Sequence, residues 1–134
     1  MCIFCKIANH EIPAYIIHED ENFMAFLDLS QATLGHTLVI PKKHQVNLFD
    51  MDDQTGSSIL LFVRDLAKQI TEAMGSESVN IIHNAGSLAG QSVFHFHIHI
   101  IPRYENDHFH IPPLKNELTP DELLSIQKKI KEKH

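Results

Sequence analysis

Short stretches of apolar residues separated by polar turns predict five strands in this chain. Residues 15–18 and 23–27 form two apolar stretches on either side of a polar turn, and residues 35–41 form a third that ends at a proline. Residues 79–82 and 93–101 are two more, and a loop that contains two glycines separates them. Segments of this length and composition are typical of strands.

Two other segments have the spacing of helices. In residues 52–74 apolar side chains recur every three or four positions, which predicts a long helix with one buried face. The residues of that face are Ile59, Val63, Leu66, Ile70 and Ala73. Asp52 or Asp53 can cap the start of this helix, and Gly75 can end it. A capping box that begins at Thr119, with a proline at the first helical position, predicts a C-terminal helix.

These elements predict an α+β fold: a five-stranded, mainly antiparallel sheet with one long helix and a C-terminal helix, in a single domain over residues 1–134. The chain is 43% hydrophobic and 21% charged, unlike a disordered protein. Its 17 acidic residues against 11 Lys and Arg give a net charge of -6, which argues against nucleic acid or an anionic membrane as a partner. We see no signal peptide and no segment long enough to span a bilayer, and therefore expect a cytoplasmic protein.

Histidine is unusually frequent, at 11 of 134 residues. Three of the histidines occupy every second position in the last predicted strand. Side chains alternate between the two faces of a strand, so His95, His97 and His99 should share one face. The apolar residues of the opposite face are Phe94, Phe96, Ile98 and Ile100. Three interpretations are open: a solvated outer face, a mononuclear metal site, or a histidine that acts as nucleophile or acid–base group.

The sequence resembles the histidine triad (HIT) family of nucleotide-binding proteins. His-Phe-His-Ile-His-Ile-Ile has the family form His-φ-His-φ-His-φ-φ, in which φ is apolar. Other segments that resemble family blocks occur in family order: Cys-Ile-Phe-Cys-Lys-Ile at 2–7, Ile-Pro-Ala at 12–14, Ala-Phe-Leu-Asp-Leu at 25–29, Gly-His-Thr-Leu-Val-Ile-Pro-Lys-Lys-His at 35–44 and Gly-Gln-Ser-Val at 90–93. The resemblance covers nearly the whole chain.

The resemblance implies an enzyme that hydrolyses or transfers a nucleoside monophosphate, with AMP expected. The bond cleaved would be in a nucleoside phosphoramidate, an adenylate or a dinucleoside polyphosphate. His97 would be the nucleophile that forms a nucleotidyl-histidine intermediate, and no catalytic metal is required. The alternative is a purine-nucleotide-binding regulatory module with little turnover.

The resemblance also assigns groups around the phosphate. His99, Ser92 and the backbone of Gly90 and Gln91 would donate hydrogen bonds to it. Asn84 would lie near the phosphate or the leaving group, although a simple turn residue has the same pattern. His36 would orient a proton behind the nucleophile, although a buried structural histidine is also possible.

For the nucleoside, the resemblance makes Asp28 the acceptor for the ribose hydroxyls. Phe4 would contact the base, together with Ile3, Ile7 and Leu29, although apolar residues of this kind more often belong to a core. The other histidines are expected in loops or on the surface. These are His10, His18, His83, His108, His110 and His134.

Cys2 and Cys5 are the two cysteines of the chain, and they form a Cys-x-x-Cys pair. They could be idle thiols, a redox pair or metal ligands, but a redox motif requires a strand before the first cysteine. Some HIT proteins hold a Cys₂His₂ zinc ion with such a pair, and here His44 and His95 would complete the site. With four protein ligands this Zn²⁺ would be structural.

The family commonly forms homodimers, and burial of the long helix at an interface would agree with this expectation. The branch within the family stays open. The chain has no Trp, whereas phosphoramidate hydrolases of the family tend to carry one near the C-terminus. Pro102 and Arg103 resemble instead the bacterial HIT proteins and the diadenosine-polyphosphate branch. The leaving group could therefore be an amine, a nucleotide or an acyl phosphate.

Overall fold

The computed structural model describes residues 2–112 and 115–133, and it has the predicted α+β fold. Two single 3-10 turns, η1 (Leu48–Asp50) and η2 (Ser87–Ala89), interrupt the loops. The helices and strands in chain order are α1 (Ile3–Ala8), β1 (Ile16–Glu19), β2 (Phe23–Leu27), β3 (Thr37–Pro41), α2 (Asp53–Met74), β4 (Ser78–Ile82), β5 (Ile98–Arg103) and α3 (Pro120–Lys131). Within the described residues no helix is both long enough and apolar enough to cross a membrane.

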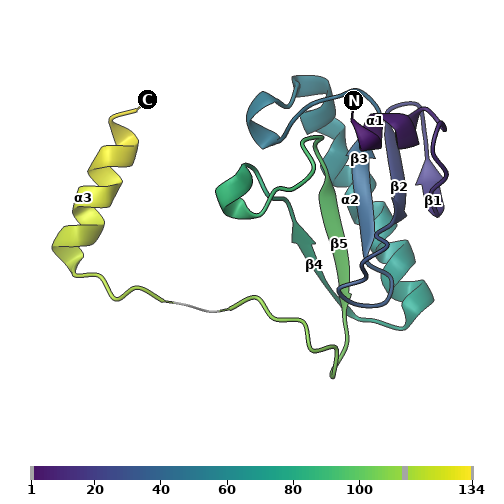
Figure 1. The fold of residues 1–134 in the computed structure, drawn as a ribbon. Coiled ribbons are helices and arrows are strands. Elements are labelled where there is room, and N and C mark those ends of the chain that lie inside the picture. Colours follow the sequence, from purple (N-terminus) through teal and green to yellow (C-terminus); the bar gives the residue numbers. More distant parts are fainter. Residues whose placement is uncertain (1, 113–114, 134) are drawn as a thin grey trace.

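The five strands form one antiparallel sheet in the order β1-β2-β3-β5-β4. β2, β3 and β5 are its interior strands, and β5, which carries His99, lies between β3 and β4. β1 and β4 form the two edges of the sheet (Figure 1).

Helix α2 covers one face of the sheet (Figure 1). The Asp52 side chain caps its start by accepting from the Thr55 N–H, and Gly75 ends it in the left-handed region at φ 69°. Its buried apolar residues pack against Phe23, Ala25, Val39, Phe96, Ile98 and Ile100 of the sheet and the segment before β5. The prediction for Ala73 was wrong: this residue is exposed, because the last turn of α2 buries nothing, and Ala67 lies on the buried face instead.

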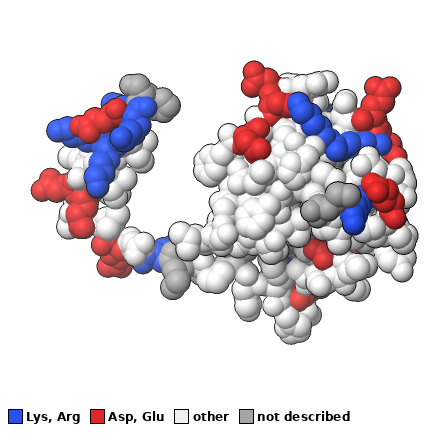
Figure 2. Space-filling model, turned by 45° about the horizontal axis from the view of Figure 1, so that its top comes forward, with Lys and Arg blue, Asp and Glu red and all other residues white. Residues whose placement is uncertain are grey.

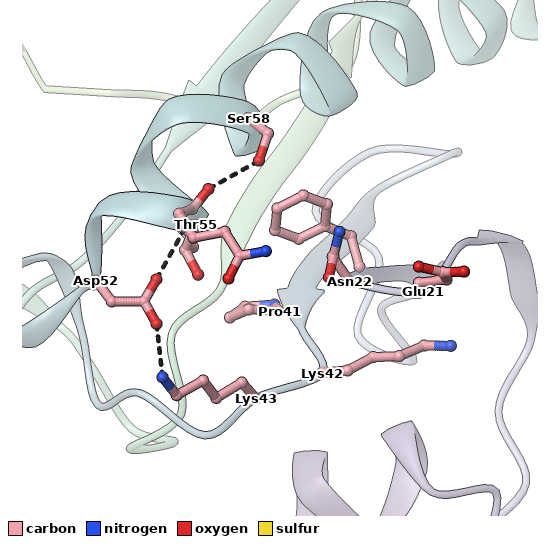
Figure 3. Close-up of a pocket in the computed structure, with 10 residues that line it drawn as sticks. Glu21, Asn22, Pro41, Lys42, Lys43, Asp52, Thr55 and Ser58 are labelled. Carbon is pink, nitrogen blue, oxygen red and sulfur yellow. Dashed lines mark hydrogen bonds and ion pairs between the residues drawn. The ribbon is translucent and has the colours of Figure 1, made fainter.

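Figure 3 shows a hollow at the start of α2, lined also by the turn before β2 and by the end of β3. Asp52 lies there between Lys43, whose Nζ is 2.8 Å from Oδ2, and the backbone of Thr55. These contacts hold the pKa of the Asp52 carboxyl at about 2, chiefly through the bond from Lys43. Lys43 and Asp52 of this hollow therefore form an ion pair with each other.

Helix α1 packs on the opposite face of the sheet, and the sequence did not predict it. Cys2 caps it through a bond from the Cys5 N–H to the Cys2 Sγ. Phe4 and Ile7 bury their side chains against β2 and β3 in a second apolar cluster, and the Phe4 ring meets Phe26 edge-on at 5.6 Å. α1 is thereby held over the face on which His97 and His99 lie.

The last strand begins later than predicted, at Ile98 rather than at residue 93. Before it, the Phe96 N–H donates to the Gln45 carbonyl, and the Gln91 side chain bonds the carbonyls of Val46 and Val93. These bonds replace strand pairing over residues 93–97. The alternation fails there: Phe94, expected in the core, is 49% exposed.

The remaining strand boundaries differ from the predictions by one or two residues. β1 begins at Ile16, β3 at Thr37 and β4 at Ser78. The predicted C-terminal helix is present with its capping box of Thr119 and Glu122. α3 lies apart from the rest of the molecule, on the side of β4 (Figure 1).

Candidate functional site

A cavity of about 510 Å³ opens between α1 and the sheet. Its walls are mostly apolar, and His97, His99, Asp28 and Ser92 supply polar groups. Phe4, Ile3, Ile7 and Leu29, all predicted for a base slot, also line it. A cavity of this size and character is typical of a small-molecule site.

His97 is buried in the wall of this cavity, with 6% of its surface exposed. Its Nδ1 is 2.8 Å from the carbonyl oxygen of His95, so Nδ1 carries the hydrogen and donates. The Phe4 ring packs edge-on against the imidazole at 5.2 Å, and burial lowers the pKa of His97. The ring is therefore neutral near pH 7, and Nε2 keeps a free lone pair.

His83 positions the backbone of His97, and sequence reasoning missed it. The Leu48 N–H donates to His83 Nε2 at 3.0 Å, so the hydrogen of the neutral ring is on Nδ1. That Nδ1–H donates to the carbonyl oxygen of His97 at 2.9 Å, and the ring stacks on Phe96 at 4.5 Å. No periodic pattern marks His83; the available signal was a histidine directly after a strand and before Asn84.

His36 fixes the tautomer of His99 in the same way. The Ala32 N–H donates to His36 Nδ1 at 3.1 Å, which leaves the hydrogen on Nε2. This Nε2–H donates to His99 Nδ1 at 2.9 Å, so the hydrogen of His99 is on Nε2. His99 can therefore act as a neutral hydrogen-bond donor in the cavity. Burial and the nearby His97 and His36 lower the pKa of His99 to about 4.

Asp28, His36 and His99 place three possible ligand atoms within 4.8 Å of one another. His36 Nε2 is 3.5 Å from Asp28 Oδ2. Because the bond from Ala32 assigns the hydrogen of His36 to Nε2, that nitrogen has no lone pair for a metal. This group is therefore better described as a hydrogen-bond relay than as a metal centre.

Cys2, Cys5, His44 and His95 form a group that could hold a metal ion. The Nδ1 atoms of His44 and His95 are 3.1 Å apart, and the sulfur of each cysteine is 3.3 Å from one of these nitrogens. Ligands of a tetrahedral zinc ion at its usual bond lengths lie roughly 3.3 to 3.8 Å apart.

The partners of His95 fit a ligand role. It is fully buried, and its Nε2–H donates to the Pro41 carbonyl at 2.8 Å. A metal-bound histidine commonly donates its other N–H to a backbone carbonyl in this manner. Its Nδ1 lone pair therefore faces the two sulfur atoms and His44. The donor set of two thiols and two imidazoles suits zinc.

Other predicted residues lie beside the cavity rather than in its wall. The buried Gln91 uses its side chain on backbone groups and on Asn47, including a bond from the Gly86 N–H to Oε1. Gly90, at φ 97°, and Asn84 lie next to each other in the loop before Gln91. Of this set, Ser92 is the residue that lines the cavity.

Comparison with known proteins identifies the family. The model of the HIT domain matches residues 9–106. An uncharacterized HIT-like protein of Methanocaldococcus jannaschii is 47% identical over 109 residues, which are 80% of this chain and 82% of that protein.

Two relatives have named activities. An adenosine 5'-monophosphoramidase of Schizosaccharomyces pombe is 41% identical over 76% of this chain and 74% of its own length. An adenylylsulfatase of Arabidopsis thaliana is 40% identical over 79% of this chain and 54% of its own length.

Solved structures agree with these sequence matches. A protein of Streptococcus mutans covers 98% of this chain, with 84% of its own length matched, at a TM-score of 0.94 and 39% identity. A HIT-family protein of Bacillus subtilis covers 99%, with 96% of its own length matched, at a TM-score of 0.91 and 40% identity. Both the family model and these relatives span most of the chain, and the protein belongs to the HIT family.

Proposed function

We propose that this protein hydrolyses, or transfers, AMP from a nucleoside phosphoramidate or a dinucleoside polyphosphate through a covalent intermediate on His97. The observation that carries the proposal is the tautomer of His97, whose Nδ1–H is held by a backbone carbonyl while Nε2 stays unprotonated in a cavity. Two relatives named for cleaving an AMP phosphoramidate and adenylyl sulfate support the adenylyl group as substrate.

In the first step Nε2 of His97 attacks the α-phosphorus. A nitrogen–phosphorus bond forms and the bond to the leaving group breaks; a phosphate leaves as its anion, whereas an amine takes up a proton from solvent as it leaves. The ring then carries a positive charge, which the carbonyl oxygen of His95 stabilises through its bond from Nδ1–H. In the second step water attacks the phosphorus, the bond to Nε2 breaks, AMP leaves and the ring is neutral again, with the proton of the water passing to solvent.

The roles of the other cavity residues follow from which of their groups can donate or accept a hydrogen bond. The Nε2–H of His99 and the hydroxyl of Ser92 donate to phosphate oxygens. Asp28 accepts from the ribose hydroxyls, and Phe4 contacts the base. His36 keeps the hydrogen of His99 on Nε2. Gly90 and Gln91 hold the loop that presents Ser92, and Asn84 would contact the leaving group.

We further propose that Cys2, Cys5, His44 and His95 hold a structural Zn²⁺. Bound there, the ion would join α1 and the loop after β3 to the segment that carries His97. Four protein ligands leave no coordination position for substrate, so the ion takes no part in the reaction. A cytoplasmic location, one domain over the whole chain and a homodimer also remain proposals.

The test is AMP release by wild-type protein and by His97→Asn, from adenosine 5'-phosphoramidate and from a diadenosine polyphosphate in parallel. His110→Asn, an exposed histidine outside the cavity, is the control. We expect His97→Asn to lose activity by at least 10³-fold while AMP binding is retained. Continued AMP release by this variant would refute the nucleophile. A wild-type protein that binds AMP but turns over neither substrate would support the regulatory alternative.

A further inference from the structure

The loop between β2 and β3, residues 28–36, carries a residue of the proposed site at each end. Asp28, at its start, lines the cavity as the proposed acceptor for the ribose, and His36, at its end, holds the hydrogen of His99 on Nε2. The Asp28 N–H donates to the His36 carbonyl at 3.0 Å, which joins the two ends. The positions of both residues therefore depend on how this loop is closed.

Gln31 closes the loop with its side-chain amide, and the proposed reaction gives it no role. Its Nε2 donates to the carbonyls of Asp28 and His36, the second at 2.7 Å. Its Oε1 accepts from the N–H groups of Gly35 and His36 at 2.8 and 3.1 Å. Two carbonyls and two N–H groups thus fix which end of the amide is the oxygen, and they use its two hydrogens and two lone pairs. Three of the four bonds end on Asp28 or His36.

The peptide that follows Gln31 sets the tautomer of His36. Its N–H belongs to Ala32 and donates to His36 Nδ1 at 3.1 Å. Burial lowers the pKa of His36, so the ring is neutral near pH 7 and its one hydrogen lies on Nε2. Because Ala32 is joined directly to Gln31, the bonds of the Gln31 amide hold this N–H in place.

The tautomer of His36 decides which atom His99 presents to the cavity. With its hydrogen on Nδ1, His36 would present a lone pair at Nε2, and His99 would have to donate to it from Nδ1. The Nε2 of His99 would then carry a lone pair and could not donate to a phosphate oxygen. A side chain of the loop therefore controls, through two successive hydrogen bonds, whether a donor or an acceptor faces the phosphate.

The loop also fixes the carboxylate of Asp28. The Ser30 N–H donates to Asp28 Oδ1 at 2.8 Å. Oδ2 lies 3.5 Å from His36 Nε2, whose hydrogen goes to His99 at 2.9 Å, so Oδ2 keeps lone pairs for a ligand. The main chain of Asp28 is bonded on both sides, through its N–H to His36 and through its carbonyl to Gln31. Loss of the amide would release one of these two bonds.

We propose that Gln31 is a positioning residue of the site: its amide holds Asp28 toward the ribose and keeps the hydrogen of His99 directed at the phosphate. The proposal rests on the proposed function for the identity of the ligand. Gln31 itself lies in an exposed loop and acts through the residues at the two ends of that loop.

Other bonds attach the same loop to the sheet and allow a matched control. The Thr33 hydroxyl donates to the Pro102 carbonyl and the Tyr104 hydroxyl to the Leu34 carbonyl, both at 2.6 Å. These bonds end in the middle of the loop, whereas those of Gln31 end on Asp28 and His36. Loosening of the loop as a whole can therefore be separated from loss of its internal closure.

Two variants of Gln31 test the proposal. Gln31→Met removes the amide at nearly equal length, and Gln31→Glu keeps the acceptor oxygen but loses both donor hydrogens. Tyr104→Phe is the control for attachment of the loop. Gln127→Met makes the same substitution on α3, which Figure 2 shows away from the body of the protein. Thermal unfolding establishes that each variant is folded, and Gln31→Glu alone decides if Gln31→Met does not fold.

The first measurement is the tautomer of His99, from long-range ¹H–¹⁵N spectra of the imidazole rings at pH 7. In the wild type and both controls we expect the hydrogen of His99 on Nε2. In the Gln31 variants we expect signals that are shared between the two tautomers. Unchanged His99 signals in the Gln31 variants overturn the proposal, and so does an equal change in Tyr104→Phe. This measurement requires neither nucleotide nor turnover.

The second measurement is the affinity for AMP relative to 2',3'-dideoxy-AMP, which lacks both ribose hydroxyls of AMP. We expect this ratio to fall about threefold or more in the Gln31 variants and to stay at the wild-type value in both controls. A wild-type ratio in the Gln31 variants overturns the proposal. A wild type that does not discriminate refutes the role of Asp28, and the His99 spectrum then decides for Gln31. Absence of AMP release would refute the proposed reaction and leave both measurements intact.

Discussion

The ring of His83 donates its Nδ1–H to the carbonyl oxygen of His97 at 2.9 Å. Because Leu48 supplies an N–H to the other ring nitrogen, His83 is held in one tautomer and one orientation. The backbone of His97 is thus bonded to a side chain, while its own ring is bonded to the backbone of His95. The orientation of the proposed nucleophile depends on both bonds.

We therefore predict that His83→Phe lowers kcat for AMP release about three- to tenfold with little change in KM. The lost hydrogen bond is worth about 0.5–1.5 kcal/mol, and each 1.4 kcal/mol in the barrier is tenfold in rate. His83→Gln, whose amide can donate to the same carbonyl, should recover part of the rate. Equal kcat values for the two variants at equal thermal stability would show that His83 serves folding alone.

The low pKa of His99 predicts a loss of stability in acid. The folded protein holds this pKa at about 4, below its usual 6.5, through burial and the neighbouring His97, His36 and His83, with Asp28 acting in the opposite direction. Between these two values the unfolded chain binds the proton more tightly. The contribution of His99 is thus complete above pH 6.5 and is lost as the pH falls toward 4, with a slope of up to about 1.4 kcal/mol per pH unit.

Urea unfolding from pH 7 to pH 4.5 measures this effect in wild-type protein and in His99→Gln. We expect the free energy of unfolding of the variant to fall less steeply with decreasing pH than that of the wild type. Comparison of the two proteins in the same buffers cancels the titration of the other groups. Parallel curves would contradict the assignment of a low pKa to His99.

The sequence could predict the sheet, α2 and the capped α3, because each is set by a local pattern. Ile59, Val63, Leu66 and Ile70 recur at helical spacing and are buried together. Phe94 shows where local pattern fails. Its alternation continues that of β5, but long-range bonds to Gln45 and from Gln91 replace the strand there. α1 has only six residues, too few for a periodic signal.

The candidate site was predictable to the extent that the triad motif names its residues. The tautomers were not, because the partners that set them are distant in sequence: Leu48 and His97 for His83, and His99 for His36. The position of α3 was also unpredictable, since an amphipathic helix has the same pattern whether it packs on its own chain or on another.

The group of Cys2, Cys5, His44 and His95 predicts that the stability of the fold depends on a bound metal ion. Cys5→Ser should reduce zinc from about one equivalent per chain to a small fraction and lower Tm by several degrees, because a structural zinc site contributes free energy to the fold. A chelator should lower the Tm of the wild type and leave that of the variant unchanged. The measurements are elemental analysis and thermal unfolding, with His10→Asn as a control outside the group. Equal zinc content in Cys5→Ser and wild type would contradict the site.

Gly35 and Gly75 both have positive φ, but only Gly35 has close neighbours. Substituting each by Ala therefore separates the cost of backbone strain from the cost of close side-chain contacts. At Gly75, φ is 69° and a Cβ would meet nothing within 4 Å. Gly75→Ala should therefore cost about 1 kcal/mol of stability from backbone strain alone. At Gly35, φ is 98° and a Cβ would come within 3.1 Å of Met74 Cγ and 3.2 Å of Pro102 Cγ.

We expect Gly35→Ala to cost about 2–3 kcal/mol, because close contacts add to the strain. Gly35 directly precedes His36, so the same variant should also lower kcat for AMP release, whereas Gly75→Ala should leave kcat unchanged. Urea unfolding and steady-state kinetics of the two variants measure both effects. If Gly35→Ala and Gly75→Ala lower the free energy of unfolding equally, the contacts with Met74 and Pro102 relax freely. If the two variants also have equal kcat, the turn before His36 does not position the relay to His99.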